Sequence, residues 1–322
     1  MFISRDDTHT HIHIPHGHFY LILFLIFISI GALSFIGYKY YQANYYDSSL
    51  NGSEIKEIQQ QSIPLDVLQV LKQKQEASST PQLVPPIKTS VELSSVVHVP
   101  ILMYHYVEYV KDKGDKTRIS LNTTPNTLEQ EVKTLSEAGF TFMTNGELAD
   151  VLYGKSKLPP KPILLTFDDG YRDFYTDAYP ILKKYHTKAT QYVIAGFLNR
   201  SNHLTTTQLQ EIASDGLVEI GAHTVHHIWL KGKSLKDVSS EVFQSKLILQ
   251  KIINKPVLSF AYPFGAFDEQ AVQVVKDAGF TTATSTIPGI DQKQEYRYFL
   301  YRLRPGGRVG QSLIDWLNQT KF

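Results

Sequence analysis

One apolar run in the chain ends in paired acids: Leu164-Leu165-Thr166-Phe167-Asp168-Asp169-Gly170. The run begins at Pro162, and a continuous apolar run of this length is typical of a buried strand in a parallel sheet. In α/β proteins, ligands bind at the carboxyl ends of such strands, where these two acids stand. Neighbouring carboxylates repel one another unless a cation or a shared proton relieves them. The run therefore predicts an α/β protein with a metal ion at this strand end.

A group of histidines follows a second apolar run. Residues 218–222 resemble a short strand and lead into His223-Thr224-Val225-His226-His227. His223 and His227 are four residues apart, and on one helical turn this spacing places both imidazoles on the same face, where they can share an ion. His226 is expected to face away, although counting alone leaves a His223/His226 pair open.

These residues can together supply the ligands of one metal ion. Two imidazoles and one carboxylate are a common ligand set for hydrolytic Zn²⁺, with a position left for water. Either Asp168 or Asp169 can be the carboxylate ligand, and the other is then free to act as a base. Taken separately, paired acids before glycine often form a turn, and paired histidines often lie on the surface. Their placement at two strand ends favours the metal site.

Composition narrows the class of protein. The chain has 322 residues, enough for one large core with appendages. Its formal net charge of +1 lacks the basic excess of a nucleic-acid-binding protein, so we expect no nucleic-acid partner. It has no cysteine, so a metal ion must be held by nitrogen and oxygen atoms. No obligate protein partner is evident from the sequence.

The first 96 residues divide into three predicted segments. Residues 1–18 carry five histidines, and we expect a solvated tail rather than a metal-sequestering tract. Residues 19–38 are predicted to be a transmembrane anchor, because their uncharged apolar run is long enough, at about 28 Å as a helix, to span a bilayer core. Residues 39–96, rich in glutamine and then in proline, are predicted to form a stalk.

Localisation follows from that anchor. A cleaved signal peptide is the alternative, but the apolar run exceeds the usual length and no clear cleavage site follows it. Tyrosines follow the run directly, as in an interfacial aromatic belt. We therefore expect a single-pass protein of the cell membrane with its catalytic domain extracellular.

Residues 97–322 are predicted to form one α/β domain. Strand-like runs alternate with helical stretches, which implies a parallel sheet or barrel. The predicted strands are 99–105, 162–167, 189–195, 218–222, 257–261 and 281–285, and the predicted helices are 127–138, 146–153, 173–185, 206–214, 235–253 and 269–278.

Two further strand ends carry candidate catalytic groups. His105 ends the first strand, where it is a candidate general acid, the alternative being a packed core histidine. The motif Phe260-Ala261-Tyr262-Pro263-Phe264-Gly265 ends a later strand. Its proline and glycine fix a turn that can present backbone N–H groups to an oxyanion, although an ordinary turn has the same composition.

Residues 166–170 and 223–227 resemble the first two motifs of the polysaccharide deacetylases, the NodB-homology domain of carbohydrate esterase family 4. The resemblance covers residues from about 97 to 308. It implies a distorted (β/α)7 barrel in which Asp169, His223 and His227 bind one divalent metal ion and Asp168 is the catalytic base. Zn²⁺ is the expected ion, and other divalent transition metals also suit this set.

The resemblance also concerns the motif at residues 260–265. In the family the equivalent aromatic residue supplies an oxyanion-binding N–H, which implies this role for Phe264. We place Tyr262, Pro263 and Gly265 in the substrate-binding region, together with Arg302. Arg302 is expected to orient Asp168 or to contact the substrate, and a structural arginine is the alternative.

Departures from the family pattern refine the expected substrate. Peptidoglycan-type members carry an arginine in the third motif, a later Asp-x-x-Asp-Trp and a later general-acid histidine, and the sequence after His227 has none of these. The Tyr104-His105 pair, the third motif and residues 300–304 instead look like the subgroup that de-N-acetylates poly-β-1,6-N-acetylglucosamine. In that subgroup the first-strand histidine is implicated in catalysis, which favours His105.

The expected function is therefore metal-dependent removal of N-acetyl groups from an extracellular N-acetylglucosamine polysaccharide, with poly-β-1,6-N-acetylglucosamine as the first candidate. Deacetylation of N-acetylglucosamine in peptidoglycan is the alternative within the same class of enzyme. An inactive glycan-binding module is the alternative from a different class.

Overall fold

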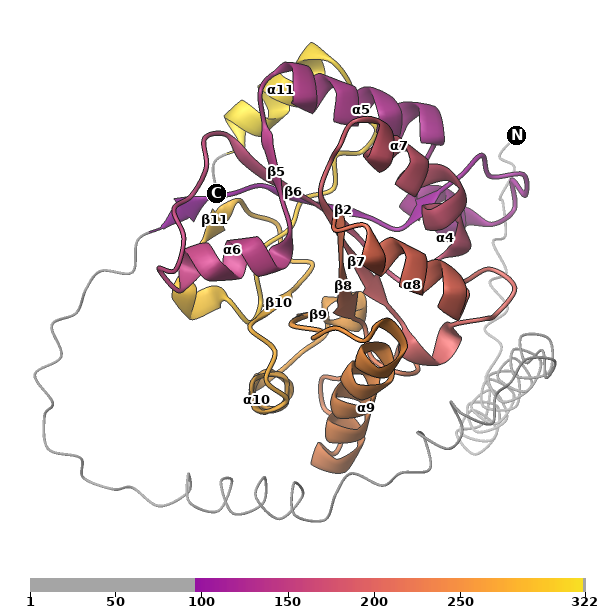
Figure 1. Cartoon of the computed structure of the whole chain (residues 1–322), viewed down its shortest axis with the longest axis vertical. Helices are drawn as coiled ribbons and strands as arrows, with labels where there is room; N and C mark the ends of the chain where they lie inside the picture. The colour runs from indigo at the N-terminus through magenta and orange to yellow at the C-terminus, as the bar shows by residue number, and fades with distance from the viewer. Residues whose placement is uncertain (1–95, 321–322) are drawn as a thin grey trace, which may run out of the picture. The chain divides into compact units, whose positions relative to one another are not determined.

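The computed structural model describes residues 96–320, and their centre is a curled parallel sheet (Figure 1). Within this range the sheet has seven strands in the order β10-β9-β8-β7-β6-β2, and β5 also pairs with β6. The strands are β2 Ile101–Tyr104, β5 Thr141–Met143, β6 Pro162–Phe167, β7 Ala189–Val193, β8 Val218–Ala222, β9 Ser259–Ala261 and β10 Thr282–Thr284. All pairings are parallel, which confirms the predicted α/β fold.

The two outer strands of the sheet, β10 and β2, both pair with residues 300–303. At the β10 edge, the Leu300 N–H donates to the Ala283 carbonyl at 2.8 Å. At the β2 edge, the Leu303 N–H donates to the Ile101 carbonyl, also at 2.8 Å. Both contacts are parallel bridges. This short segment therefore joins the sheet edges where a regular barrel would have a full strand, in agreement with the expected distorted barrel.

Helices surround the sheet on the outside (Figure 1). In chain order they are α4 Lys116–Leu121, α5 Pro125–Glu137, α6 Asn145–Leu152, η1 Phe174–Ala178, α7 Tyr179–Lys184, η2 Ala195–Phe197, α8 Thr206–Ser214, α9 Leu235–Ile253, η3 Pro263–Gly265, α10 Glu269–Asp277, η4 Gln294–Tyr296 and α11 Gln311–Gln319. Helix α11 packs against α5, and α9 packs against both α8 and α10. The apolar sides of these helices and the strands form the core.

Short strand pairs flank the sheet. Strands β1 (Val97–His98) and β11 (Asp291–Gln292) are antiparallel, whereas β3 (Tyr106–Val107) and β4 (Asn122–Thr123) are parallel. Strand β6 lies centrally, and its residues 163–167 are all buried. One side of β6 pairs with β2, and β5 and β7 share the other side. The carboxyl end of β6 therefore lies between β2 and β7.

Several element boundaries differ from the prediction for local chemical reasons. Helix α5 begins before Thr127, because Thr124 is its N-cap and accepts the Thr127 N–H at 3.2 Å. The predicted helix 173–185 begins with the π-helical turn η1 and continues as α7. Pro180 lies in the first turn of α7, directly after the π-helical turn, and the first turn is where a helix tolerates proline.

Membrane association is not visible in the described part of the chain. No helix within residues 96–320 is both long and apolar enough to cross a bilayer. The predicted tail (1–18), anchor (19–38) and all but the last residue of the stalk (39–96) lie outside the described residues.

Glu131 of α5 places a carboxyl group in the core. Its Oε2 accepts a hydrogen bond from the Tyr104 hydroxyl at 2.8 Å, whereas Oε1 has no hydrogen-bond partner among residues 96–320. Burial raises the pKa of Glu131 from 4.5 to about 7. The neutral acid therefore stabilises the fold at low pH, and this contribution is lost as the pH rises from about 4.5 through about 7.

We predict that Glu131→Gln raises the free energy of unfolding, relative to the wild type, by about 2–3 kcal/mol more at pH 8 than at pH 5. The reason is that the amide cannot ionise, whereas the buried carboxyl group does so at the higher pH. Urea unfolding at both pH values measures this difference. Glu137→Gln, at an exposed position of the same helix, is the control and should change little. If the difference in stability between Glu131→Gln and wild type were the same at pH 5 as at pH 8, the raised pKa of Glu131 would be contradicted.

Candidate metal centre

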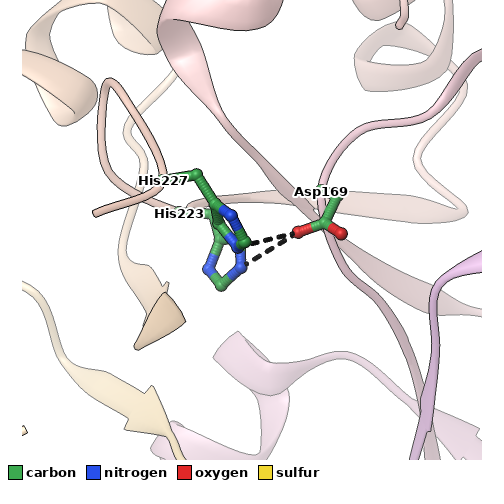
Figure 2. Close-up of side chains that lie close together, drawn as sticks. All are labelled: Asp169, His223 and His227. Atoms are coloured by element: carbon green, nitrogen blue, oxygen red, sulfur yellow. Dashed lines mark ion pairs between the residues drawn. The ribbon is translucent and has the colours of Figure 1, made fainter. Parts of the chain in front are cut away.

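Three predicted ligands meet at the carboxyl ends of β6 and β8. Figure 2 shows His223 and His227 pointing at Asp169. Asp169 Oδ1 lies 3.2 Å from His223 Nε2 and 3.3 Å from His227 Nε2. The three potential ligand atoms all lie within 4.8 Å of one another. Two strand ends that are far apart in the sequence, at Phe167 and Ala222, therefore bring one carboxylate and two imidazoles to a common point.

The predicted helical turn at residues 223–227 is wrong, although the two histidines do converge. The segment leaves β8 as an irregular loop, and Thr224 and His227 have positive φ values of 64° and 54°. The Thr224 hydroxyl accepts the His227 N–H at 2.9 Å. Because left-handed residues reverse the chain sharply, a tight loop brings the two imidazoles together without a helix.

Glu241 on α9 holds this loop in place. Its Oε2 accepts the backbone N–H groups of Val225 and His226, each at 2.9 Å. Its Oε1 lies 2.7 Å from Nδ1 of His226, whose side chain is 53% exposed. His226 therefore turns away from the ligand set, as expected, and the alternative His223/His226 pair does not form. Sequence reasoning missed Glu241, whose only signal was an acid on the buried face of an amphipathic helix.

The tautomer of His223 is fixed by the backbone. Its Nδ1 lies 2.7 Å from the Ala261 carbonyl oxygen, which can only accept, so Nδ1–H is the donor. In the neutral imidazole, Nε2 is therefore the nitrogen available to bind a cation beside Asp169. This arrangement is typical of a histidine that ligates a metal through Nε2 and is oriented through Nδ1.

The ligand set fits a divalent cation. Asp169 is buried, and within residues 96–320 its Oδ1 has no hydrogen-bond partner. A buried carboxylate oxygen without a donor is costly, and a cation at this point would remove the cost. Although burial raises the pKa of Asp169, its histidine neighbours hold it well below the usual range, so the carboxylate is ionised. Nitrogen and oxygen donors of this kind suit Zn²⁺ and other divalent transition metals.

The neighbouring acid, Asp168, has a different partner. Its two oxygens accept hydrogen bonds from the two terminal nitrogens of Arg302, each at 2.8 Å. Arg302 is 1% exposed, and its Nε donates to the Ser285 carbonyl at 2.8 Å. Of the roles expected for Arg302, the structure thus places it against Asp168. Burial raises the pKa of Asp168, but the guanidinium outweighs this and holds that pKa below its usual value.

His105 lies beside this pair. Its Nε2 is 3.9 Å from Asp168 Oδ2, and its side chain is mostly buried. Burial lowers the pKa of His105 below its ordinary value of 6.5, against the opposing effect of the two nearby acids. The imidazole is therefore mainly neutral at neutral pH and can accept a proton from its neighbourhood.

The third motif presents Phe264 at the surface and keeps its neighbours inside. Phe264 has a positive φ of 59°, and its ring centroid lies 4.5 Å from that of His227. Gly265 follows with φ of 67°, and a Cβ there would lie 2.0 Å from Thr286 Oγ1. Only glycine therefore fits this turn, which holds Phe264 beside the ligand set.

Tyr262 and Pro263 do not lie where direct substrate contact was expected. Both are buried, and the Tyr262 ring packs against Phe260 and Phe267. The predicted substrate-binding role of their side chains is therefore not supported. Their position is explained by the strand β9, which directs them into the core before the chain turns outward at Phe264.

We predict that Glu241→Ala lowers the affinity for Zn²⁺ by about 10–100-fold, because the loop of the two histidines loses the acceptor that fixes it. Competition with a chelating dye measures the affinity, and circular dichroism checks the fold. Glu241→Gln keeps a carbonyl oxygen for the two N–H groups and should retain most of the affinity. Equal affinities of wild type and Glu241→Ala would rule out this role.

Known proteins resemble both the sequence and the fold. The sequence model of the family described as polysaccharide deacetylase matches residues 155–283. The YxkH protein of Bacillus subtilis (strain 168), whose name places it among the polysaccharide deacetylases, is 31% identical over 224 residues, 69% of this chain and 77% of its own length. The structure of the deacetylase PplD of Streptococcus pyogenes in complex with acetate has a TM-score of 0.64 and 29% identity, covering 71% of this chain and 100% of that one.

A third relative is named by its substrate. The poly-beta-1,6-N-acetyl-D-glucosamine N-deacetylase of Staphylococcus aureus (strain MSSA476) is 31% identical over 166 residues, which is 47% of this chain. The match spans 56% of that relative's length, a little more than half. The residues that converge on Asp169, the parallel sheet and these similarities agree, and the chain belongs to the polysaccharide deacetylase family.

Proposed function

We propose that this protein is a metal-dependent hydrolase that removes N-acetyl groups from N-acetylglucosamine residues of an extracellular polysaccharide, first of all poly-β-1,6-N-acetylglucosamine. One observation carries the proposal: Asp169 meets His223 and His227 beside a second acid, Asp168, that is held by Arg302. The staphylococcal relative named for that polymer supports the choice of substrate.

Asp169, His223 and His227 would hold the cation. When bound, the cation supplies Lewis acidity that polarises the acetamide carbonyl and acidifies a water molecule. Asp168 accepts the proton of the attacking water, since its pairing with Arg302 keeps it ionised. Arg302 also fixes the direction of both carboxylate oxygens through its bidentate contact.

Two further groups complete the reaction. The neutral His105, 3.9 Å from Asp168, takes up the proton passed on from that acid and donates it to the departing amine. The exposed turn at Phe264 offers its backbone N–H to the oxyanion. The products are acetate and a glucosamine amine, which is cationic at neutral pH. Such a positive charge would promote retention of the polymer at an anionic cell surface.

The location is proposed from the sequence alone. An uncharged apolar run at residues 19–38 is long enough to anchor the chain in the cell membrane. A stalk over residues 39–96 would then hold the catalytic domain outside, within reach of an extracellular polymer.

We predict that Asp169→Asn and His223→Ala each reduce acetate release by about 100-fold or more, because either change removes a ligand. Acetate is measured with the full-length protein on poly-β-1,6-N-acetylglucosamine and on peptidoglycan, with and without a chelator. His226→Ala is the matched control, since His226 lies on the same loop but faces away.

The outcomes separate the alternatives. Faster release from peptidoglycan than from the exopolymer would replace the proposed substrate with the other polymer. Turnover that survives both the chelator and Asp169→Asn would refute the ligand assignment. A folded protein that binds zinc and both polymers but releases no acetate would indicate an inactive glycan-binding module.

A further inference from the structure

Two large aromatic side chains lie exposed beside the candidate metal centre in the described part of the chain. Trp229 is 52% exposed and Phe264 is 57% exposed. Their rings are stacked, with centroids 5.8 Å apart and an interplanar angle of 27°. They come from different segments, the loop after His227 and the turn after β9. Adjacent exposed aromatic side chains beside a polar site are typical of a ligand-binding surface.

The rings of His227, Phe264 and Trp229 form a row of pairwise contacts beside the ligand set. The His227 ring, which faces Asp169 through Nε2, lies 4.5 Å from the Phe264 ring. The Phe264 ring in turn lies next to that of Trp229. In this row of contacts the Phe264 ring stands between those of His227 and Trp229. A molecule lying along this row would contact Trp229 at a point beside the reacting group.

The exposure of both rings is fixed by their surroundings. Phe264 is held in a left-handed conformation, uncommon for a bulky residue, by the turn that Gly265 makes possible. The neighbours of Trp229 point inward, since Leu230 is fully buried and Ile228 packs against the core. Trp229 therefore lies on an anchored segment, and its ring stays in solvent because nothing in the described residues covers it fully.

We propose that Trp229, together with Phe264, forms an aromatic platform that binds the apolar face of a pyranose ring. The occupant is the sugar next to the one whose acetamide is hydrolysed. An N-acetylated polymer carries no charge, and each of its rings has a face of C–H groups that can lie on an aromatic ring. The proposal rests on the proposed function, because it names a subsite of the same polysaccharide.

The platform makes Trp229 a specificity-determining residue with a defined length dependence. On this proposal, a single N-acetylglucosamine placed for hydrolysis contacts Phe264 and not Trp229. A chain of several sugars extends along the row and contacts both rings. Trp229 should therefore affect the binding of oligomers and leave the reaction of the monomer unchanged.

Kinetics with the full-length protein test this length dependence. Acetate release is measured on β-1,6-linked N-acetylglucosamine monomer and pentamer. Trp229→Ala should raise KM for the pentamer by about tenfold, change kcat by less than about twofold and leave the monomer kinetics as in the wild type. Trp229→Phe keeps a ring and should restore most of the affinity. Leu247→Ala, at an exposed apolar position on α9, is the control.

A binding measurement separates failure of the platform from failure of the proposed function. The chain has two tryptophans, Trp229 and Trp316, so the fluorescence change that is lost in Trp229→Phe reports on Trp229. Pentamer should change this signal even with Asp168→Asn, which is expected to be inactive. A response without turnover by the wild type supports the platform and refutes the deacetylase function. No response, or an unchanged pentamer KM in Trp229→Ala, overturns the platform.

Discussion

Two adjacent buried carboxylates at the end of β6 impose the main constraint on this structure. Each would be unstable alone, because a buried charge without a partner costs several kcal/mol. Asp168 is balanced by Arg302, and Asp169 by the imidazoles that would share a cation with it. The positive φ of Asp169, 75°, turns the chain between them, so that neighbours in the sequence face different partners. In the proposed mechanism, Asp168 is thereby kept for the role of base and Asp169 for that of metal ligand.

These partners come from distant parts of the chain. Arg302 belongs to the segment that joins the sheet edges, and His223 and His227 follow β8. The third motif of this chain, residues 260–265, contains no arginine. The arginine beside Asp168 comes from residues 300–303 instead. The closed parallel sheet is what allows side chains from both places to reach the end of β6.

Much of this could be predicted from the sequence where the signal is local. The bounds of β6, β8, α8 and α9 follow from apolar runs and helical periodicity, and the structure matches them. The convergence of the ligands followed from strand ends and residue types. Strand β5 was missed because three residues have too little periodicity to identify, and its pairing with β6 is a long-range contact. Trp229 was missed because exposure is a tertiary property.

The geometry of the histidine loop was outside the reach of spacing rules. A four-residue interval fits a helical turn, but left-handed conformations at Thr224 and His227 achieve the same approach, and non-glycine residues give no sequence signal for them. Glu241 looked like one more polar residue of an amphipathic helix. Its role depends on the backbone N–H groups of Val225 and His226, which donate to Glu241 rather than to a backbone carbonyl. Their loop packs against α9 only in the folded domain.

The position of Arg302 has a consequence for the order in which the domain matures. A ribosome makes residues 300–303 after nearly all of the barrel, so every strand of the sheet is synthesised before the guanidinium that orients Asp168. The Asp168 carboxylate thus gains the partner that fixes its direction only once the sheet edges are joined. Under the proposed mechanism, half-made or partly opened domains would carry the metal ligands but lack an ordered base, which would tie hydrolytic activity to completion of the fold.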